Sequence, residues 1–350
     1  MEVTLVCHYL DQAVGYGMAR YSYNLYRALE KEGVSVRTIS TKPQDDSALK
    51  SGVDFFISIP LTALLRKPET SLYHFTVPQA GFAIPLLRSL RKRKIVSTIY
   101  DINPLLLAKE RRSYLLVSKA LETAFRNSDA LVAISSLAKN DIVERFSIDP
   151  SLITVTSLGV DERFRPAPPG TEKPERPFTI GYAGGFAANK NVRSLILAYS
   201  AFRKSYPGGS RLLLYGKGPE LDNCMKLCKS LALGDSVSFM GFADESKLPE
   251  IHRSFDLFVF PSLTEGFGLP IIEAQKSGVP CAVLSTGRIP EEVTRFCLKA
   301  DGTDGLAEIM NDVREKGFVF TPEHRDHLSR FSWRNCALST IKAYKAALGE

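Results

Sequence analysis

The chain of 350 residues is 44% hydrophobic, 24% charged and 10% aromatic, with a formal net charge of +7, a composition that excludes a disordered chain. Its length exceeds the size at which one hydrophobic core keeps growing, so we expect two domains, and its 24 Gly and 20 Pro follow no period, which excludes collagen-like and low-complexity architectures. No apolar run approaches the roughly 20 residues that span a bilayer, and the first residues carry no signal-peptide pattern, so we expect a soluble, cytoplasmic protein.

The first half of the chain alternates predicted strands and helices. Short apolar runs predict buried strands, whereas apolar residues three or four positions apart predict helices. Arg20–Lys31 has this helical spacing, and Gly33 ends it. The other predicted helices are Ser113–Arg126 and Ser135–Phe146, and the predicted strands are Val3–Tyr9, Val34–Ile39, Val53–Ile59, Ile95–Tyr100, Asp129–Ile134 and Ile153–Ser157.

A proline-rich segment separates the two halves. Five prolines between Arg163 and Pro177 cannot continue a helix or a central strand, so we expect a semi-rigid linker at residues 167–177. The alternation then restarts. The predicted strands are Phe178–Ala183, Arg211–Tyr215, Val237–Met240, Leu257–Phe260 and Pro280–Leu284, and the predicted helices are Asn191–Phe202, Glu220–Leu231, Glu245–Arg253, Pro270–Ser277 and those that follow to the C-terminus.

Strands separated by helices predict right-handed crossovers and parallel sheets. We therefore expect an α/β protein with two doubly wound domains, residues 1–166 and 178–332, followed by a helix at 333–350. In such folds a ligand binds outside the carboxyl ends of the strands, here in the cleft between the domains.

Six cysteines are spread singly along the chain, without a Cys-x-x-Cys pair, so we expect reduced thiols with structural roles. The five His show no metal-binding spacing, so we expect no metal site. The cysteines are Cys7, Cys224, Cys228, Cys281, Cys297 and Cys336.

A cationic cluster follows the apolar residues 84–87. It places five cations within seven residues: Arg88, Arg91, Lys92, Arg93 and Lys94. Such a segment suits the anionic lipid at the inner face of a cell membrane, or a phosphorylated substrate. The alternative is a solvated helix end. No nucleic-acid-binding motif accompanies the cluster, so we expect no nucleic-acid partner.

The loop after the predicted strand Leu257–Phe260 carries the clearest chemical signal. It contains two glycines and leads to a helix that begins at Pro270, so its backbone N–H groups and the helix dipole suit a diphosphate or a developing anion. Glu265 and Glu273 lie eight residues apart and offer carboxylates to sugar or ribose hydroxyls. The alternative is that Glu273 only caps or pairs on the helix surface.

This segment resembles the E-x7-E motif of the retaining, mannosyltransferase-like glycosyltransferases of family 4 and group 1. That family has the GT-B fold of two facing Rossmann-like domains, and the resemblance implies that residues 333–350 cross back to pack on the first domain. Six further segments match the family's motifs, in the family's order, over nearly the whole chain. They are Gly15–Arg20, Thr98–Asp101, Ser157–Asp161, Gly181–Asn191, Tyr215–Pro219 and Ile289–Glu291.

The resemblance implies roles for individual residues. Glu265 would contact the donor sugar, Glu273 the ribose and Lys190 the diphosphate. An ammonium directly before a helix also suits the charge that grows on a leaving nucleotide; a solvated lysine at a helix cap is the alternative. The catalytic candidates are Glu265, Asp101 and Lys190, and the donor-binding candidates are Gly15, Gly17, Gly184, Lys190, Gly216, Glu265, Gly266, Phe267, Gly268, Leu269 and Glu273.

The chain departs from the family pattern at two positions. Relatives often carry Arg where Gly185 stands, five residues before Lys190, and Arg288 is a candidate substitute. Tyr100 stands where many relatives have His, and tyrosine, with a pKa near ~10, is a poor base. Asp101 and His74 are the other candidates on the acceptor side.

The sequence contains no Asp-x-Asp motif, so we expect metal-independent transfer without a cofactor, from a UDP- or GDP-linked hexose such as mannose to a glycan, lipid-linked or polysaccharide acceptor. No carboxylate stands out as a nucleophile, which favours front-face transfer with retention. One alternative is a non-catalytic relative that binds sugar nucleotides, as Tyr100 and Gly185 suggest. A nicotinamide-dependent oxidoreductase is disfavoured because Arg20 stands where a third glycine would complete Gly-x-Gly-x-x-Gly.

Overall fold

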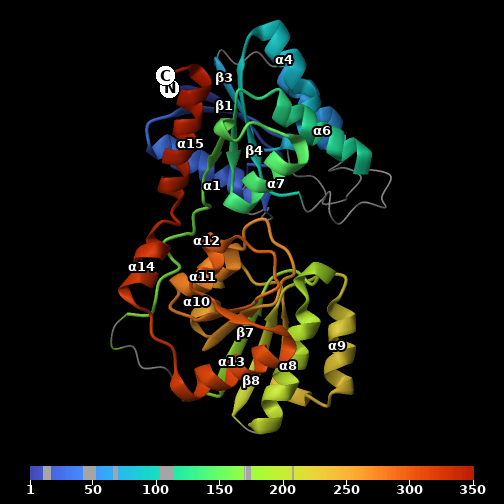
Figure 1. Cartoon of the computed structure of the whole chain (residues 1–350), viewed down its shortest axis with the longest axis vertical. Helices are drawn as coiled ribbons and strands as arrows, with labels where there is room; N and C mark the ends of the chain where they lie inside the picture. Colours follow the sequence, from blue (N-terminus) through green and yellow to red (C-terminus); the bar gives the residue numbers. More distant parts are fainter. Residues whose placement is uncertain are drawn as a thin grey trace. The chain divides into compact units, whose positions relative to one another are not determined.

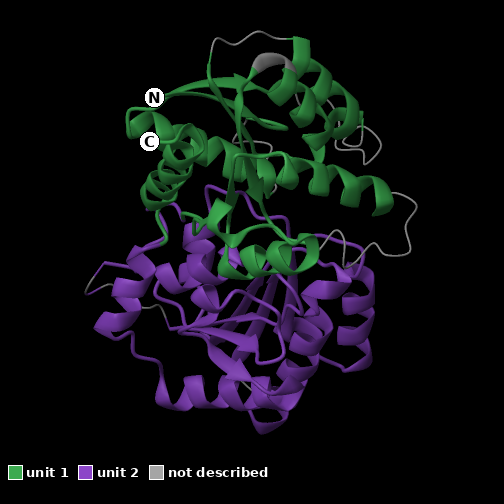
Figure 2. Ribbon diagram, turned by 45° about the horizontal axis from the view of Figure 1, so that its top comes forward, with its two compact units in different colours: residues 1–159, 331–350 green, residues 160–330 purple. Residues whose placement is uncertain are grey.

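A computed structural model of the chain describes residues 1–10, 17–41, 53–65, 70–102, 114–168, 170, 175–206 and 209–350. The chain divides into two compact units (Figure 2). Unit 1 contains Met1–Gly159 and Phe331–Glu350, and unit 2 contains Val160–Arg330. Each unit has a six-stranded sheet whose strands pair in parallel, which confirms the predicted α/β class.

The sheet of unit 1 has the strand order β2-β1-β3-β4-β5-β6. Apolar side chains fill the space between this sheet and its helices; Tyr73, Phe75 and Phe125 are among the largest of them. The strands are β1 (Glu2–Val6), β2 (Ser35–Ile39), β3 (Leu72–Phe75), β4 (Lys94–Ile99), β5 (Ala130–Ala133) and β6 (Ile153–Val155). The helices are α1 (Met18–Lys31), the π-helical turn η1 (Asp54–Ser58), α3 (Ile59–Leu65), the 3-10 helix η2 (Pro78–Ala83), α4 (Ile84–Arg91), α6 (Tyr114–Arg126), α7 (Ser136–Phe146), the 3-10 turn η3 (Pro150–Leu152) and α15 (Trp333–Leu348).

The prediction of a strand at Val53–Ile59 is wrong. These residues form η1 and the start of α3, and the strand between β1 and β4 is Leu72–Phe75. A short run of apolar residues has no period that separates a buried strand from a helix. The burial of Asp54, Ile59 and Ala63 on one side of this segment shows that its period is helical.

The C-terminal helix α15 packs on α1 and on β4, β5 and β6 (Figure 1), which confirms that the end of the chain returns to the first sheet. Gly159 permits this return, because a Cβ there would lie 2.2 Å from the Trp333 backbone nitrogen. Tyr344 on α15 is fully buried.

The sheet of unit 2 has the strand order β12-β11-β10-β7-β8-β9. The sequence did not predict its last strand, β12. The strands are β7 (Phe178–Ala183), β8 (Ser210–Tyr215), β9 (Val237–Gly241), β10 (Leu257–Phe260), β11 (Cys281–Leu284) and β12 (Leu298–Ala300). The helices are α8 (Val192–Ser205), α9 (Leu221–Ser230), α10 (Leu248–Arg253), α11 (Leu269–Lys276), α12 (Glu291–Thr294), α13 (Gly302–Lys316) and α14 (Pro322–Ser329), with 3-10 turns η4 (Ala188–Lys190) and η5 (Gly234–Ser236).

This strand order puts the topological switch point of unit 2 between β7 and β10, which pair directly although two strands separate them in sequence. The chain winds outward from β7 toward β9 and then outward from β10 toward β12. The loops after β7 and β10 therefore diverge above neighbouring strand ends, and this is where open α/β sheets bind ligands.

All six cysteines are free thiols, and five of them are buried. Burial raises the pKa of the Cys7 and Cys336 thiols to about 12. Within the described ranges, no helix is long and apolar enough to cross a membrane.

Candidate active site

Three loops meet at the carboxyl edge of the unit 2 sheet and are tied together by hydrogen bonds. The Asn189 carbonyl, in the loop after β7, accepts from the Leu263 N–H at 2.8 Å and from the Ser262 hydroxyl at 3.1 Å, both in the loop after β10. The Arg288 carbonyl, in the loop after β11, accepts from the Glu265 N–H at 3.0 Å. The backbone around Glu265 is thus held from both sides.

Lys190 and Glu265 form a two-pronged ion pair across the switch point. The Lys190 ammonium donates to Glu265 Oε1 at 2.6 Å and to Oε2 at 2.8 Å. The pair is mostly shielded from water, since 23% of the Lys190 side chain and 11% of the Glu265 side chain are exposed. Asn191, in the left-handed region at φ 51°, follows Lys190 and is the N-cap residue of α8. A cation and a carboxylate therefore lie together beside a helix N-terminus.

Two stacked aromatic rings, Phe260 and Tyr182, pack beside this ion pair. The Lys190 ammonium lies 5.6 Å from the centroid of the Phe260 ring, a cation–π distance. The Phe260 ring stacks on the buried Tyr182 ring, with centroids 5.9 Å apart. The Tyr182 hydroxyl donates to the Gly185 carbonyl at 2.6 Å, which fixes the start of the loop after β7.

The glycine loop after β8 packs backbone against backbone. Gly216 has φ +139°, and a Cβ there would lie 1.8 Å from the Gly184 carbonyl oxygen. The Gly216 N–H donates to the Gly241 carbonyl at 2.7 Å. Gly216 is therefore required by the contact between two loops, whether or not a ligand also touches it.

Glu273 lies on α11 and is buried in unit 2. It is 2% exposed, so the alternative that it pairs on the helix surface is wrong. Its Oε2 lies 3.7 Å from Nε2 of His252 on α10, an imidazole that is fully buried and whose two nitrogens have no hydrogen-bond partner. The sequence contains no signal for His252, because nothing in its local pattern separates it from a surface helix residue.

The rest of the E-x7-E segment is arranged around the start of α11. Phe267 is buried, and Gly268 is in the left-handed region at φ 103° directly before Leu269, where the helix begins. This is a position that only glycine adopts readily. Gly266 and Glu265 are both partly exposed in the loop itself.

In unit 1, His74 is not placed to meet an acceptor. It is fully buried in β3, with Nδ1 2.7 Å from the Tyr344 hydroxyl and Nε2 2.8 Å from the Thr98 hydroxyl. Burial lowers the pKa of His74 to about 3, so the ring stays neutral. His74 therefore holds α15 against the sheet, which corrects the acceptor-side role that the sequence suggested.

The other unit 1 candidates lie at the carboxyl ends of the strands. Tyr100 follows β4, and its hydroxyl donates to the Thr76 carbonyl at 2.8 Å. Desolvation raises the pKa of Tyr100, so it remains protonated and is not a base. Asp101 comes next and is partly exposed. Gly17, at φ 44°, is the N-cap residue of α1, whereas Gly15 lies outside the described residues.

Two residues of the cationic cluster form ion pairs within unit 1. Arg88 and Lys94 both pair with Asp129 Oδ1, at 3.2 and 3.3 Å, and so tie the end of α4 to the start of β4. Lys92 is exposed and left-handed at φ 49°, and Arg93 is partly exposed. Arg91 ends α4, and its side chain lies outside the described part of the chain.

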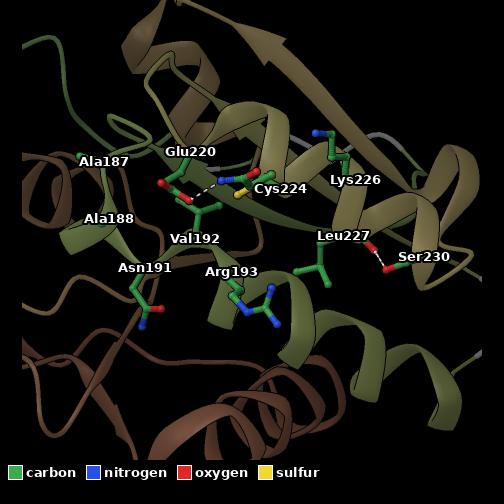
Figure 3. A pocket seen from close by; sticks show the side chains of 11 residues that line it. Ala187, Ala188, Asn191, Val192, Arg193, Glu220, Cys224, Lys226, Leu227 and Ser230 are labelled. Atoms are coloured by element: carbon green, nitrogen blue, oxygen red, sulfur yellow. Dashed lines mark hydrogen bonds between the residues drawn. The ribbon is translucent and has the colours of Figure 1, made fainter.

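A hollow of about 650 Å³ lies between α8 and α9 (Figure 3). Neither Lys190 nor Glu265 lines it, and its charged side chains are of both signs. We therefore take the ion pair at the switch point, and not this hollow, as the candidate active site. Among the described residues no group of three or more His, Cys, Asp or Glu is placed to hold a metal ion.

Residues 165–330 match the family "Glycosyl transferases group 1", and residues 15–164 match "Glycosyltransferase Family 4". The chain is 29% identical to the O-antigen chain mannosyltransferase B of Escherichia coli over 73% of this chain and 71% of that protein.

Two solved structures show the same fold. Sucrose-phosphate synthase of Thermosynechococcus elongatus matches with a TM-score of 0.79 at 19% identity, over 99% of both chains. HepE of Anabaena, solved in complex with UDP and glucose, matches with a TM-score of 0.67 at 15% identity, over 100% of this chain and 98% of that one.

Proposed function

Since this chain belongs to the group 1 and family 4 glycosyltransferases with the GT-B fold, we propose that it transfers a hexose from a nucleoside diphosphate sugar to a glycan or lipid-linked acceptor with retention of configuration. The observation that carries the proposal is the Lys190–Glu265 ion pair at the β7/β10 switch point. A nucleotide sugar has a group that complements each member of this pair. Its diphosphate can bind the ammonium, and its hydroxyls can donate to the carboxylate.

Donor binding replaces the internal ion pair with contacts to the donor. The Lys190 ammonium turns to the diphosphate, and the Glu265 carboxylate accepts from the sugar hydroxyls. As the bond between the anomeric carbon and the diphosphate oxygen breaks, negative charge grows on that oxygen. Lys190 and the N–H groups at the start of α8 stabilise this charge in a partly desolvated site. The backbone from Gly266 to Leu269 faces the sugar and phosphates.

Front-face transfer fits the groups that are present. The acceptor oxygen attacks from the side on which the diphosphate leaves, and the departing diphosphate oxygen takes the acceptor proton. No protein base is then needed, in keeping with Tyr100, whose raised pKa keeps it protonated. Asp101 would orient the acceptor hydroxyl.

Mannose is the first sugar to test, because the Escherichia coli relative is a mannosyltransferase. UDP-linked sugars come next, because HepE was solved with UDP. The test is a thermal-shift panel of UDP, GDP, ADP and their sugars, followed by product analysis, because a ligand that binds the native state raises the unfolding temperature.

One nucleoside diphosphate and the corresponding nucleotide sugar should raise the unfolding temperature. Because we propose metal-independent transfer, the nucleotide sugar should be turned over equally with EDTA or with Mg²⁺. Saturable NADH binding without any sugar-nucleotide binding would instead support an oxidoreductase. Donor binding without turnover, unchanged in Glu265→Gln, would indicate a non-catalytic relative. Location at the inner face of a cell membrane is part of the proposal and is tested separately with vesicles.

Glu273→Gln should raise the KM for the donor about tenfold or more and change kcat less than threefold. We propose that this carboxylate accepts from the ribose, a contact made equally in the ground state and the transition state. Steady-state kinetics with varied donor measure both constants. Glu220→Gln, in the hollow between α8 and α9, is the matched control. An unchanged donor KM in Glu273→Gln would remove the ribose role.

A further inference from the structure

Within the part of the chain that the structure describes, the segment from Val53 to Leu65 has one exposed apolar face. Four apolar side chains, spaced four residues apart, are 44 to 69% exposed along η1 and α3; we call them the apolar stripe, and they are Val53, Ile57, Leu61 and Leu65. The charged residue of this segment, Asp54, is buried and lies 3.3 Å from His8. The exposed face therefore carries no charge.

The apolar surface continues onto the next helix. Phe82 on η2 and Leu86 on α4 are exposed one turn apart. The Phe82 ring lies 6.3 Å from the Phe56 ring on η1, and η1 and α3 both pack against η2. Isolated exposed apolar residues are ordinary, whereas a contiguous set on adjacent helices marks a contact surface.

Cations lie at one end of this surface. α3 leads into β3 and α4 leads into β4, and these strands pair in parallel with Leu72 opposite Lys94. Both helices therefore end at the same edge of the sheet. Arg88, Lys92 and Lys94 are exposed there, and Asp129 is the carboxylate that pairs with Arg88 and Lys94. The edge thus has an excess of positive charge beside an uncharged apolar face.

We propose that unit 1 docks on an anionic lipid bilayer through this surface. The apolar stripe, Phe82 and Leu86 enter the boundary between headgroups and acyl chains, while Lys92 and its neighbours meet the lipid phosphates. An uncharged apolar face beside cations has the chemistry that such a boundary attracts. The inference rests on the proposed function, since it deepens the membrane location that belongs to it. All of these residues lie in unit 1 and outside the donor site, so vesicle binding is tested separately from sugar transfer.

Co-sedimentation with phosphatidylcholine vesicles, with and without phosphatidylglycerol, tests the proposal. The unmodified chain should bind the anionic vesicles and lose affinity as salt rises. Ile57→Asp with Leu61→Asp should weaken this binding at least about tenfold, because two apolar side chains are replaced by charges that phosphate repels. Lys92→Glu should weaken binding to anionic vesicles only. Val319→Asp is the matched control, since Val319 is 79% exposed in unit 2.

Unfolding temperature and the shift produced by the sugar nucleotide should be the same in all variants, which separates this test from that of the proposed activity. Equal vesicle binding by Ile57→Asp/Leu61→Asp and the parent would overturn the proposal. So would a dimer of the parent in light scattering that this double variant abolishes while vesicle binding is unchanged, because the surface would then hold a second copy.

Discussion

Lys190→Met is expected to lower kcat for glycosyl transfer by about 10²- to 10³-fold, the usual effect of removing one group that stabilises a developing anion. The ammonium lies at the β7/β10 switch point, directly before α8, and 23% of its side chain is exposed. In this partly desolvated position its charge acts on the leaving diphosphate with little screening by water. Methionine keeps the length and apolar contacts of the side chain. Steady-state kinetics with a saturating donor measure the effect.

Lys226→Met is the control for this prediction. Lys226 lines the hollow between α8 and α9 in the same unit, so its loss removes the same charge without touching the ion pair. A kcat of Lys190→Met within threefold of the parent would contradict the role.

A double-mutant cycle with Glu265→Gln adds a second readout. Because the two side chains are in direct contact, their effects on transfer should be strongly non-additive. Additive effects would show that the two residues act on the donor independently and not as a pair.

Gly216→Ala is expected to destabilise unit 2 by about 3 kcal/mol or more, because it combines overpacking with a backbone conformation unsuited to alanine. The new Cβ would lie 1.8 Å from the Gly184 carbonyl oxygen, at φ +139°, where neither backbone can yield without breaking its own hydrogen bonds. For a unit of this size the unfolding temperature should fall by roughly 6 °C or more. Calorimetry measures it.

Gly185→Ala is the matched control, since its Cβ would meet only the Lys217 carbonyl oxygen, at 3.9 Å. Its unfolding temperature should stay close to that of the parent. A stable Gly216→Ala protein would mean that the two loops separate easily and that Gly216 is required only by the ligand.

The sequence alone determined the α/β class, the parallel sheets and the neighbourhood of the donor candidates. Predicted and observed strands in unit 2 coincide at Phe178–Ala183 and Leu257–Phe260, and the loops that follow these two strands contain Lys190 and Glu265. This was possible because apolar runs, glycines and helix-start residues are local signals. The family motifs are local too, and each stays readable without knowledge of the strand order.

Only the tertiary structure decided which of these residues meet. The direct pairing of β7 and β10 brings Lys190 to Glu265 across 75 positions of sequence. The packing of α15 buries His74, and the packing of α10 places His252 beside Glu273. Tertiary structure also decided the conformation of Val53–Ile59, whose apolar residues fit a strand or a helix equally well. The strand position between β1 and β4 is occupied by β3, and Val53–Ile59 is helical. Burial and pairing depend on distant parts of the chain, and so no local pattern contains them.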